Sequence, residues 1–246
     1  MRRPYFVLMM TFVTGLIAYS FQATYPVHAA QSPSGTARII AKVVLNGKAP
    51  VAGRLPMGAD PACLTQNGGK AVLDPTVEAD ANGNLKDVLV YVKDIVGSYP
   101  APTTPFTLDQ SGCMYKPHVF GVIAGQPVEI LNSDPTLHNI HPLPRVNPGF
   151  NIGQPVKGLK SIKTFAKPEA PFHVRCDVHG WMSAYIGVFS HPFFGVSNDT
   201  GQVELKNLPA GTFQIQAWQE KYGIQTQSVT VAAGESKEIV FTFKAQ

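Results

Sequence analysis

Three side chains with soft or borderline donor atoms lie close together in the last third of the chain. Cys176, His179 and Met182 form the pattern Cys-x-x-His-x-x-Met, directly after a strand-like segment. A thiolate in an apolar surrounding with an imidazole beside it suits copper. A weak thioether at longer range completes the trigonal-plus-axial arrangement of copper electron-transfer sites. The pattern therefore indicates one copper ion.

A second imidazole must come from elsewhere in the fold, and His138 offers it. This histidine lies in Asn132-Ser-Asp-Pro-Thr-Leu-His-Asn139, just after a predicted strand. His141 and His118 are further candidates, although each is also explained as a hydrogen-bonded loop residue. If either joined the site, three imidazoles and one thiolate would resemble red copper, and an open coordination position could then support chemistry.

Two other chemistries compete with copper at these residues. Zinc also binds cysteine with histidine, although structural zinc sites prefer four Cys or His ligands. A cysteine nucleophile would need Cys176 beside a base such as His138, with an oxyanion hole and an orienting acid. The sequence has no signature of those two features, so catalysis through Cys176 ranks last.

The two motifs together resemble those of the plastocyanin-type cupredoxins. In that family an upstream Asn-x-Asp-x-x-x-His-Asn supplies one histidine, and Cys-x-x-His followed by Met supplies the rest. The match covers residues 119–189. The resemblance implies His138 and His179 as imidazole ligands, Cys176 as the thiolate and Met182 as the axial donor. It also implies that Asn139 braces the ligand loop.

One spacing departs from the family pattern. Plastocyanin-like sites usually have four residues between the histidine and the methionine, whereas only Gly180 and Trp181 intervene here. His-x-x-Met is the spacing of a binuclear copper loop in terminal oxidases, but that loop needs a second cysteine, which this one lacks. Met182 therefore has an alternative place in the hydrophobic core, which is common for a methionine beside a tryptophan.

The elements that position these residues are predicted to be β-strands. The chain has 22 Gly and 21 Pro, and only 15% of its residues are charged. Proline interrupts helices and is tolerated in loops and at strand edges, and short period-2 runs occur throughout. We therefore predict an all-β protein. Strands are expected at 37–45, 87–92, 119–123, 128–131, 172–176, 184–189, 226–231 and 237–243, with a long loop at 142–171.

The C-terminal part has the rhythm of a small β-sandwich, alternating strands and turns. Its Asp199-Thr-Gly-Gln-Val and Leu208-Pro-Ala-Gly-Thr-Phe segments resemble carboxypeptidase regulatory-like, or transthyretin-like, modules. This implies a structural or partner-binding role without catalysis. The whole chain also resembles secreted plastocyanin-like proteins often labelled methylamine-utilisation proteins. We predict a Greek-key cupredoxin domain at 37–190 and a regulatory-like sandwich at 191–246.

The three cysteines indicate one disulfide and one free thiol. Cys63 and Cys113 lie in polar, turn-like sequence, whereas Cys176 has a histidine three residues later. An oxidising compartment favours pairing of cysteines. We therefore predict a Cys63–Cys113 bridge and a free Cys176.

Residues 1–30 have the features of a cleaved signal peptide. Arg2 and Arg3 precede an uncharged apolar stretch, and Ala29-Ala30 suits signal peptidase. The alternative is an uncleaved anchor, but the apolar run is shorter than the roughly 20 residues that span a bilayer comfortably. We expect export to the periplasm or the exterior.

The charge balance gives no argument for binding to nucleic acid or to a membrane, and no stretch after residue 30 is long and apolar enough to cross one. The formal net charge is +4, from 20 basic and 16 acidic residues, and this bias is too weak for either partner. We predict an exported mononuclear copper protein that carries electrons to or from a protein redox partner and is not an enzyme. The alternatives are copper storage or delivery, and a red-copper-like site with an open position.

Overall fold

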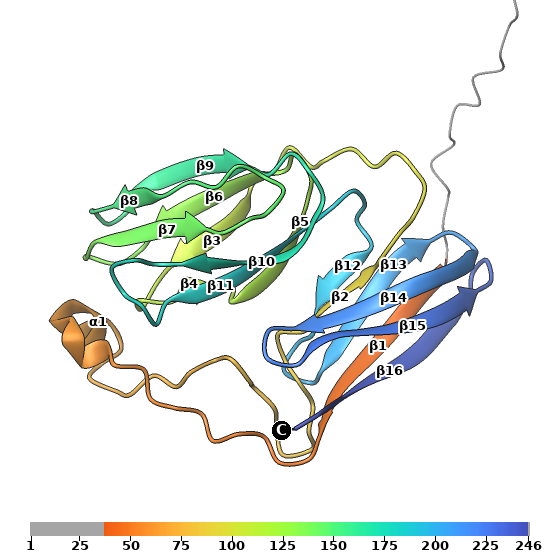
Figure 1. Cartoon of the computed structure of the whole chain (residues 1–246), viewed down its shortest axis with the longest axis horizontal. Helices are drawn as coiled ribbons and strands as arrows, with labels where there is room; N and C mark the ends of the chain where they lie inside the picture. The colour runs from red at the N-terminus through yellow and green to blue at the C-terminus, as the bar shows by residue number, and fades with distance from the viewer. Residues whose placement is uncertain (1–36, 246) are drawn as a thin grey trace, which may run out of the picture. The chain divides into compact units, whose positions relative to one another are not determined.

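The structure is a computed structural model that describes residues 37–245 (Figure 1). This range forms sixteen strands, one short helix and one turn of 3-10 helix. The all-β prediction is therefore confirmed. The predicted signal peptide at residues 1–30 lies outside the described residues. Within residues 37–245, no helix combines the length and the apolar character that crossing a bilayer requires.

Two sheets enclose the hydrophobic core that contains Cys176. In spatial order, the larger sheet consists of β5 (Val119–Ile123), β11 (Ser183–Phe189), β10 (Glu169–Arg175), β7 (His138–Pro142) and β8 (Ile152–Gln154). The second consists of β4 (Tyr115–Lys116), β3 (Phe106–Gln110), β6 (Pro127–Asn132) and β9 (Lys160–Thr164). Alternating residues of β6 are buried, as expected for a strand with one face on a core.

Two of these strands, β8 and β9, lie in the segment 142–171 that is predicted to be a loop. β9 pairs antiparallel with β6 at the edge of its sheet, and none of its residues is fully buried. The prediction of an uninterrupted loop is therefore wrong. The sequence conceals this strand because its backbone pairs with β6 while its side chains provide no hydrophobic alternation.

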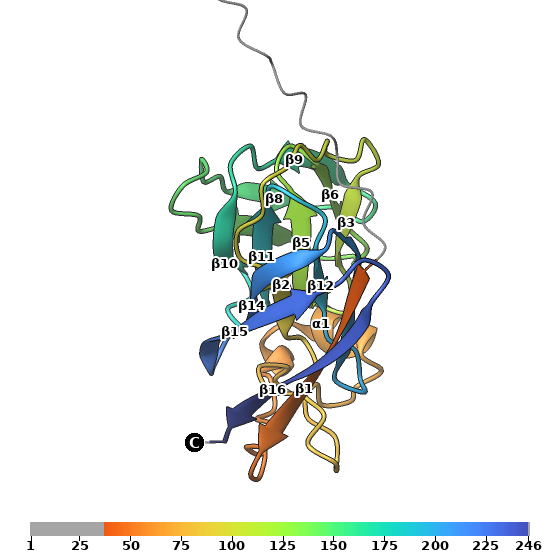
Figure 2. The same cartoon turned by 90° about the vertical axis from the view of Figure 1, so that its right-hand side faces the viewer.

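The remaining strands form a second pair of sheets. One contains β13 (Gln202–Leu208), β1 (Ala37–Asn46) and β16 (Ser236–Lys244), and the other contains β12 (Phe194–Val196), β2 (Leu89–Val92), β14 (Gly211–Gln219) and β15 (Gly223–Val231). β1 runs parallel to β16, beside it in Figure 2. The C-terminal sheets therefore include residues 37–46 and 89–92, which the predicted boundaries assign to the cupredoxin domain.

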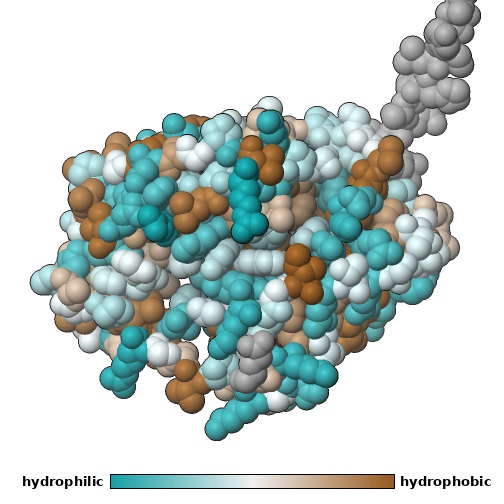
Figure 3. Space-filling view, viewed as in Figure 1, coloured by the Kyte–Doolittle hydropathy of each residue, from teal (hydrophilic) through white to brown (hydrophobic). Residues whose placement is uncertain are grey.

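Hydrophobic side chains gather inside these sheets. One core cluster is shared by β1, β2 and the C-terminal strands, and another lies between the sheets that carry the candidate ligands. On the face shown in Figure 3, apolar side chains occur in small separate groups among polar ones. Burial of apolar surface is therefore the main source of stability for both pairs of sheets.

The long connection between β1 and β2 carries the only helical segments in residues 37–245. These are η1 (Met57–Ala59) and α1 (Pro61–Gln66), drawn in orange in Figure 1. The Asp60 carboxylate accepts a hydrogen bond from the Ala62 amide at 2.8 Å and caps α1. A disulfide joins Cys63 of α1 to Cys113, so the predicted bridge is confirmed. Cys176 is free and buried.

Candidate metal centre

His138, Cys176 and His179 converge at a buried point. His138 begins β7, Cys176 follows β10, and His179 lies in the turn before β11. Their candidate ligand atoms all lie within 4.8 Å of one another, and all three residues are buried. The two Nδ1 atoms are 3.0 Å apart, and the Cys176 Sγ lies 4.0 Å from the His179 Nδ1.

This arrangement fits a small metal ion. For zinc, which binds the same donor types, metal bonds measure about 2.0–2.1 Å to imidazole nitrogen and about 2.3 Å to thiolate sulfur. Both observed separations are shorter than the sum of two such bonds, as donors to one shared ion require. Two imidazoles and a thiolate are also the equatorial donor set of copper electron-transfer sites.

The turn between β10 and β11 fixes Cys176 relative to His179. The Cys176 amide donates to the Met182 carbonyl at 3.2 Å, and the Met182 amide donates to the His179 carbonyl at 2.9 Å. These bonds close the turn just beyond the Arg175–Ser183 pair of the two strands. The spacing Cys-x-x-His thus places both donors on one short, hydrogen-bonded loop.

Backbone amides point at the Cys176 sulfur. His179 N and Asn139 N donate to Sγ at 3.3 and 3.5 Å. Burial opposes ionisation of this thiol, but the hydrogen bonds from His138 and from the amides outweigh it and lower its pKa. A metal-binding cysteine must be a thiolate, so these contacts favour the ligand form.

Asn139 links the two halves of the site. Its Oδ1 accepts a hydrogen bond from the Asp177 amide, in the loop that carries Cys176 and His179. Its own amide is one of the donors to Cys176 Sγ. This is the bracing that the resemblance implies for Asn139.

Asp134 holds the ring of His138. The His138 Nε2 lies 3.0 Å from the Asp134 Oδ2, and the carboxylate also accepts from the amides of Gly112 and Cys113 at 2.8 and 2.7 Å. Burial works against ionisation of both partners. The hydrogen bonds from His138 and from the two amides nevertheless lower the pKa of Asp134. The hydrogen bonds with Asp134 and Cys176 raise the pKa of His138.

Asn132, the asparagine two residues before Asp134, holds the loop between β6 and His138. Its Oδ1 accepts from the Asp134 amide at 2.9 Å, and its Nδ2 donates to the carbonyls of Thr136 and Gln154 at 2.9 and 2.8 Å. Asn132 is fully buried, so these bonds satisfy polar groups that water does not reach. They fold the loop that delivers His138.

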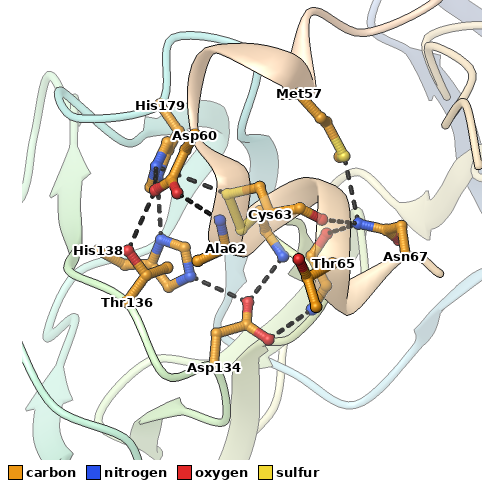
Figure 4. Close-up of a disulfide and its surroundings, with 12 residues drawn as sticks. Met57, Asp60, Ala62, Cys63, Thr65, Asn67, Asp134, Thr136, His138 and His179 are labelled. Carbon is orange, nitrogen blue, oxygen red and sulfur yellow. Dashed lines mark hydrogen bonds and ion pairs between the residues drawn. A yellow bond between two sulfur atoms is a disulfide. The ribbon is translucent and has the colours of Figure 1, made fainter. Parts of the chain in front are cut away.

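Asp60 holds the ring of His179 in the same way (Figure 4). The His179 Nε2 lies 2.9 Å from the Asp60 Oδ2. Thr136 donates to the same oxygen at 3.1 Å. The hydrogen bond with His179 is the largest influence on Asp60 and lowers the pKa of its carboxyl. The neighbouring disulfide brings Cys63 Sγ within 3.6 Å of the His179 Nε2.

Met182 lies beside the cluster in sequence and in the core. Its residue is 1% exposed, and it belongs to the core cluster that includes Cys176. Its backbone bonds to both Cys176 and His179 complete the ligand loop. Its assignment as the axial donor stays a prediction.

The other two candidate histidines have partners away from the cluster. His141 Nδ1 lies 2.9 Å from an Asp177 carboxylate oxygen. His118 Nδ1 donates to the Ser183 carbonyl at 2.9 Å, and its Nε2 bonds to the Glu220 carboxylate. Neither is among the described groups whose donor atoms converge within 4.8 Å.

Sequence reasoning did not assign roles to Asp60 and Asp134. Asp134 stands inside the quoted motif, so its spacing of four residues from His138 was the available signal. Asp60-Pro61 is a recognisable helix start, with a capping residue followed by proline. The predicted disulfide connects that start to Cys113, but nothing in the sequence places it over His179.

Comparisons with known proteins return partial structural matches. No protein-family model and no curated protein matches the chain. The Cu-containing nitrite reductase from Thermus scotoductus SA-01 is similar at 19% identity, covering 60% of this chain and 28% of that one, with a TM-score of 0.33. This chain therefore spans less than a third of that reductase.

Two smaller copper proteins are also similar. A Cu(I) form of an amicyanin variant has 20% identity, covers 34% of this chain and 81% of its own, and has a TM-score of 0.31. The purple cupredoxin from Nitrosopumilus maritimus has 18% identity, covers 34% of this chain and 98% of its own, and has a TM-score of 0.30. The structural neighbours are thus cupredoxins at low identity and over part of this chain.

Proposed function

We propose that this protein binds one copper ion through the Nδ1 atoms of His138 and His179 and the thiolate of Cys176, and that it transfers electrons. Met182 is proposed as the weak axial donor. The observation that carries the proposal is the convergence of two imidazole nitrogens and a free thiol at one buried point. When bound, copper would supply the one-electron couple between Cu(II) and Cu(I).

The surroundings of the donors favour electron transfer over delivery or catalysis. His138, Cys176 and His179 are 0%, 2% and 3% exposed, so a substrate or a metal acceptor has little access to them. Hydrogen bonds fix each ring and the thiolate in place, and a fixed ligand set needs little rearrangement when the charge of the metal changes. These residues orient the metal and exclude water.

The donor chemistry also favours copper over zinc. Structural zinc sites are closed by four Cys or His ligands, whereas the described cluster offers one cysteine and two histidines. The carboxylates of Asp60 and Asp134 bond to the outer Nε2 atoms of the rings. The soft thioether of Met182 would be the remaining donor, and thioethers select copper.

We further propose that the protein works outside the cytoplasm with a protein redox partner. The buried disulfide between Cys63 and Cys113 supports this location, since disulfides persist in oxidising compartments. The signal-peptide features of residues 1–30 agree with it. We propose an electron carrier rather than an enzyme.

Anaerobic copper titration tests the binding site. Wild type should bind one copper per chain and show an intense thiolate-to-copper absorption band with the EPR signal of one Cu(II). Cys176→Ser should lose the band, because serine cannot provide the thiolate. His141→Ala is the matched control, since it removes a histidine outside the cluster and should leave the spectrum unchanged. Colourless wild type with tightly held zinc would overturn the proposal.

Met182→Leu tests the axial donor separately. Leucine has nearly the same volume, so the core should tolerate it. If Met182 is the axial ligand, the copper-loaded variant keeps the thiolate band but changes its intensity ratios and the Cu(II) EPR parameters. Spectra identical to wild type would remove Met182 from the ligand set and leave the other three ligands in place.

A further inference from the structure

The outer edge of His179 is covered by a segment that is remote in sequence. The side chain is 4% exposed, and its Nε2 faces Asp60 at 2.9 Å and Cys63 Sγ at 3.6 Å. The Trp181 ring stands beside it, with centroids 5.0 Å apart. His179 therefore meets protein groups on the side opposite to its Nδ1.

Asp60 is held over His179 by several independent contacts. It caps α1 through the Ala62 amide, and its second oxygen bonds to Thr136. The disulfide of Cys63 anchors the helix, and Asn67 at its end donates to the Gly112 carbonyl at 2.9 Å. Figure 4 shows the carboxylate between the helix and the imidazole. The position of Asp60 is thus built into the fold.

We propose that Asp60 is a positioning residue for His179. Its carboxylate accepts a hydrogen bond from the Nε2–H group, so the Nδ1 lone pair is directed at the cluster. A carboxylate on the outer nitrogen of a metal-binding histidine fixes the tautomer and the orientation of its ring. The inference rests on the proposed copper site for its metal-binding part, while the tautomer belongs to the metal-free protein as well.

The decisive variant is Asp60→Asn. Asparagine also caps helices, so its Oδ1 can keep the bond from the Ala62 amide. Its NH2 group then replaces the oxygen that faces His179 and cannot accept a hydrogen bond from an Nε2–H group. The proton should move to Nδ1, where it competes directly with the metal. Loss of such a partner typically weakens metal binding about 10–100-fold.

Two further variants serve as controls. Asp80→Asn makes the same charge change at an exposed turn, where the carboxylate also accepts the amide two residues on, at 2.8 Å. It should behave as wild type. Asp60→Ser keeps a capping residue but is too short to reach His179, so it should also weaken copper binding. If copper binding is weaker in both Asp60→Asn and Asp60→Ser, loss of the helix cap cannot be the cause, because both variants keep a capping residue.

The experiment combines nitrogen NMR of the His179 ring in metal-free protein with copper affinity and reduction potential at fixed neutral pH. We expect an Nε2-protonated ring in wild type, an Nδ1-protonated ring in Asp60→Asn, and weaker copper binding with a higher reduction potential in that variant. An unchanged tautomer with unchanged affinity would overturn the inference. If the tautomer differs between wild type and Asp60→Asn but wild type binds no copper, the role of Asp60 is upheld and the copper proposal is rejected.

Discussion

Each candidate imidazole ligand has a carboxylate on its outer nitrogen, Asp134 for His138 and Asp60 for His179. These acids come from different parts of the chain, yet they do the same job. The inner nitrogens are left to face Cys176. At the scale of single residues, the site is therefore a set of oriented donors in which hydrogen bonds decide which ring nitrogen is available to a metal.

Replacing Asp134 should destabilise the metal-free protein. Asp134→Asn keeps the shape of the side chain but replaces one of the oxygens that accept from Gly112, Cys113 and His138. A buried donor left without its acceptor costs about 1–3 kcal/mol, and we expect a loss of that order in the free energy of unfolding at neutral pH, measured with denaturant.

The pH dependence of that loss has a defined sign. The folded-state pKa of Asp134 is lowered, so its contribution is present above the unfolded value of about 3.8 and disappears as the pH falls through the folded value. The difference between wild type and Asp134→Asn should therefore shrink on acidification. A constant difference down to the lowest pH would contradict an ionised, hydrogen-bonded Asp134.

The candidate donor residues could be predicted from the sequence, but not all of the residues that orient them. Cys176, His179 and His138 stand out by residue type and spacing, and the structure brings their donor atoms together. Asp60 has no such pattern. Its role depends on a contact with His179 across 119 positions of sequence, and local sequence does not determine a contact of that range.

At the scale of elements, the candidate site is formed by the β10–β11 hairpin, by β7 and by the disulfide-bonded helix α1. The β10–β11 turn supplies Cys176 and His179, and β7 supplies His138. The disulfide attaches α1 to the residues that follow β3. Because a six-residue helix is marginal on its own, α1 depends on this attachment and on packing to stay above the site.

Removing the disulfide should therefore lower the stability of the protein and loosen α1 above His179. The Cys63–Cys113 bridge closes a loop of 50 residues, for which chain entropy predicts roughly 4 kcal/mol. We expect Cys63→Ala/Cys113→Ala to lose a few kcal/mol in guanidinium unfolding and to become sensitive to protease near residues 57–66. Wild-type resistance there would show that packing alone holds the helix.

Element prediction succeeded for strands that contain a clear hydrophobic run and failed for elements such as β9 and α1 that contain none. β5, β6 and β11 follow hydrophobic runs and appear within a residue of their predicted limits. β9 carries lysines at an exposed edge, and α1 is too short for a helical period to be visible. β9 forms because its backbone pairs with β6, and α1 forms because it is attached to Cys113 and packs above the site.

At the scale of the whole molecule, the two pairs of sheets meet through apolar and ionic contacts. Leu89, Tyr91, Val119 and Phe189 form a small core cluster of their own. Beside them His118, just before β5, bonds through Nε2 to Glu220, which follows β14. This ion pair connects the strands of the candidate site to the C-terminal strands.

The His118 contact should make the stability of the metal-free protein depend on pH. Burial opposes the imidazolium, but the bond to Glu220 and the charges of Glu220 and Asp87 outweigh it and raise the pKa of His118. Its stabilisation is therefore complete below the unfolded value of about 6.5 and is lost as the pH rises through the folded value.

Unfolding free energies measured from pH 6 to 9 check this linkage. Wild type should lose stability across the window above pH 6.5, and His118→Gln should show a flatter profile. His141→Gln is the control, since His141 is partly exposed and lies outside this contact. Equal slopes in wild type and His118→Gln would contradict the linkage.

Strand partners are the part of the fold that the sequence left open. β1 and β2 are clear hydrophobic strands, but β1 pairs with β13 and β16, and β2 pairs with β12 and β14. Alternation defines the face that a strand buries and says nothing about a partner far along the chain. The boundaries predicted at residue 190 reflect chain order, whereas the sheets combine both ends of residues 37–245.

Spectroelectrochemical titration of the copper-loaded protein tests whether the metal bound by Cys176 carries one electron reversibly. The thiolate-to-copper band should bleach on reduction and return on reoxidation as a reversible one-electron couple, with one copper per chain, and His141→Ala should behave identically. This result would show that Cys176 binds a copper ion that takes up and releases one electron. A protein that binds copper without the band, or whose band does not return, is not the proposed electron carrier.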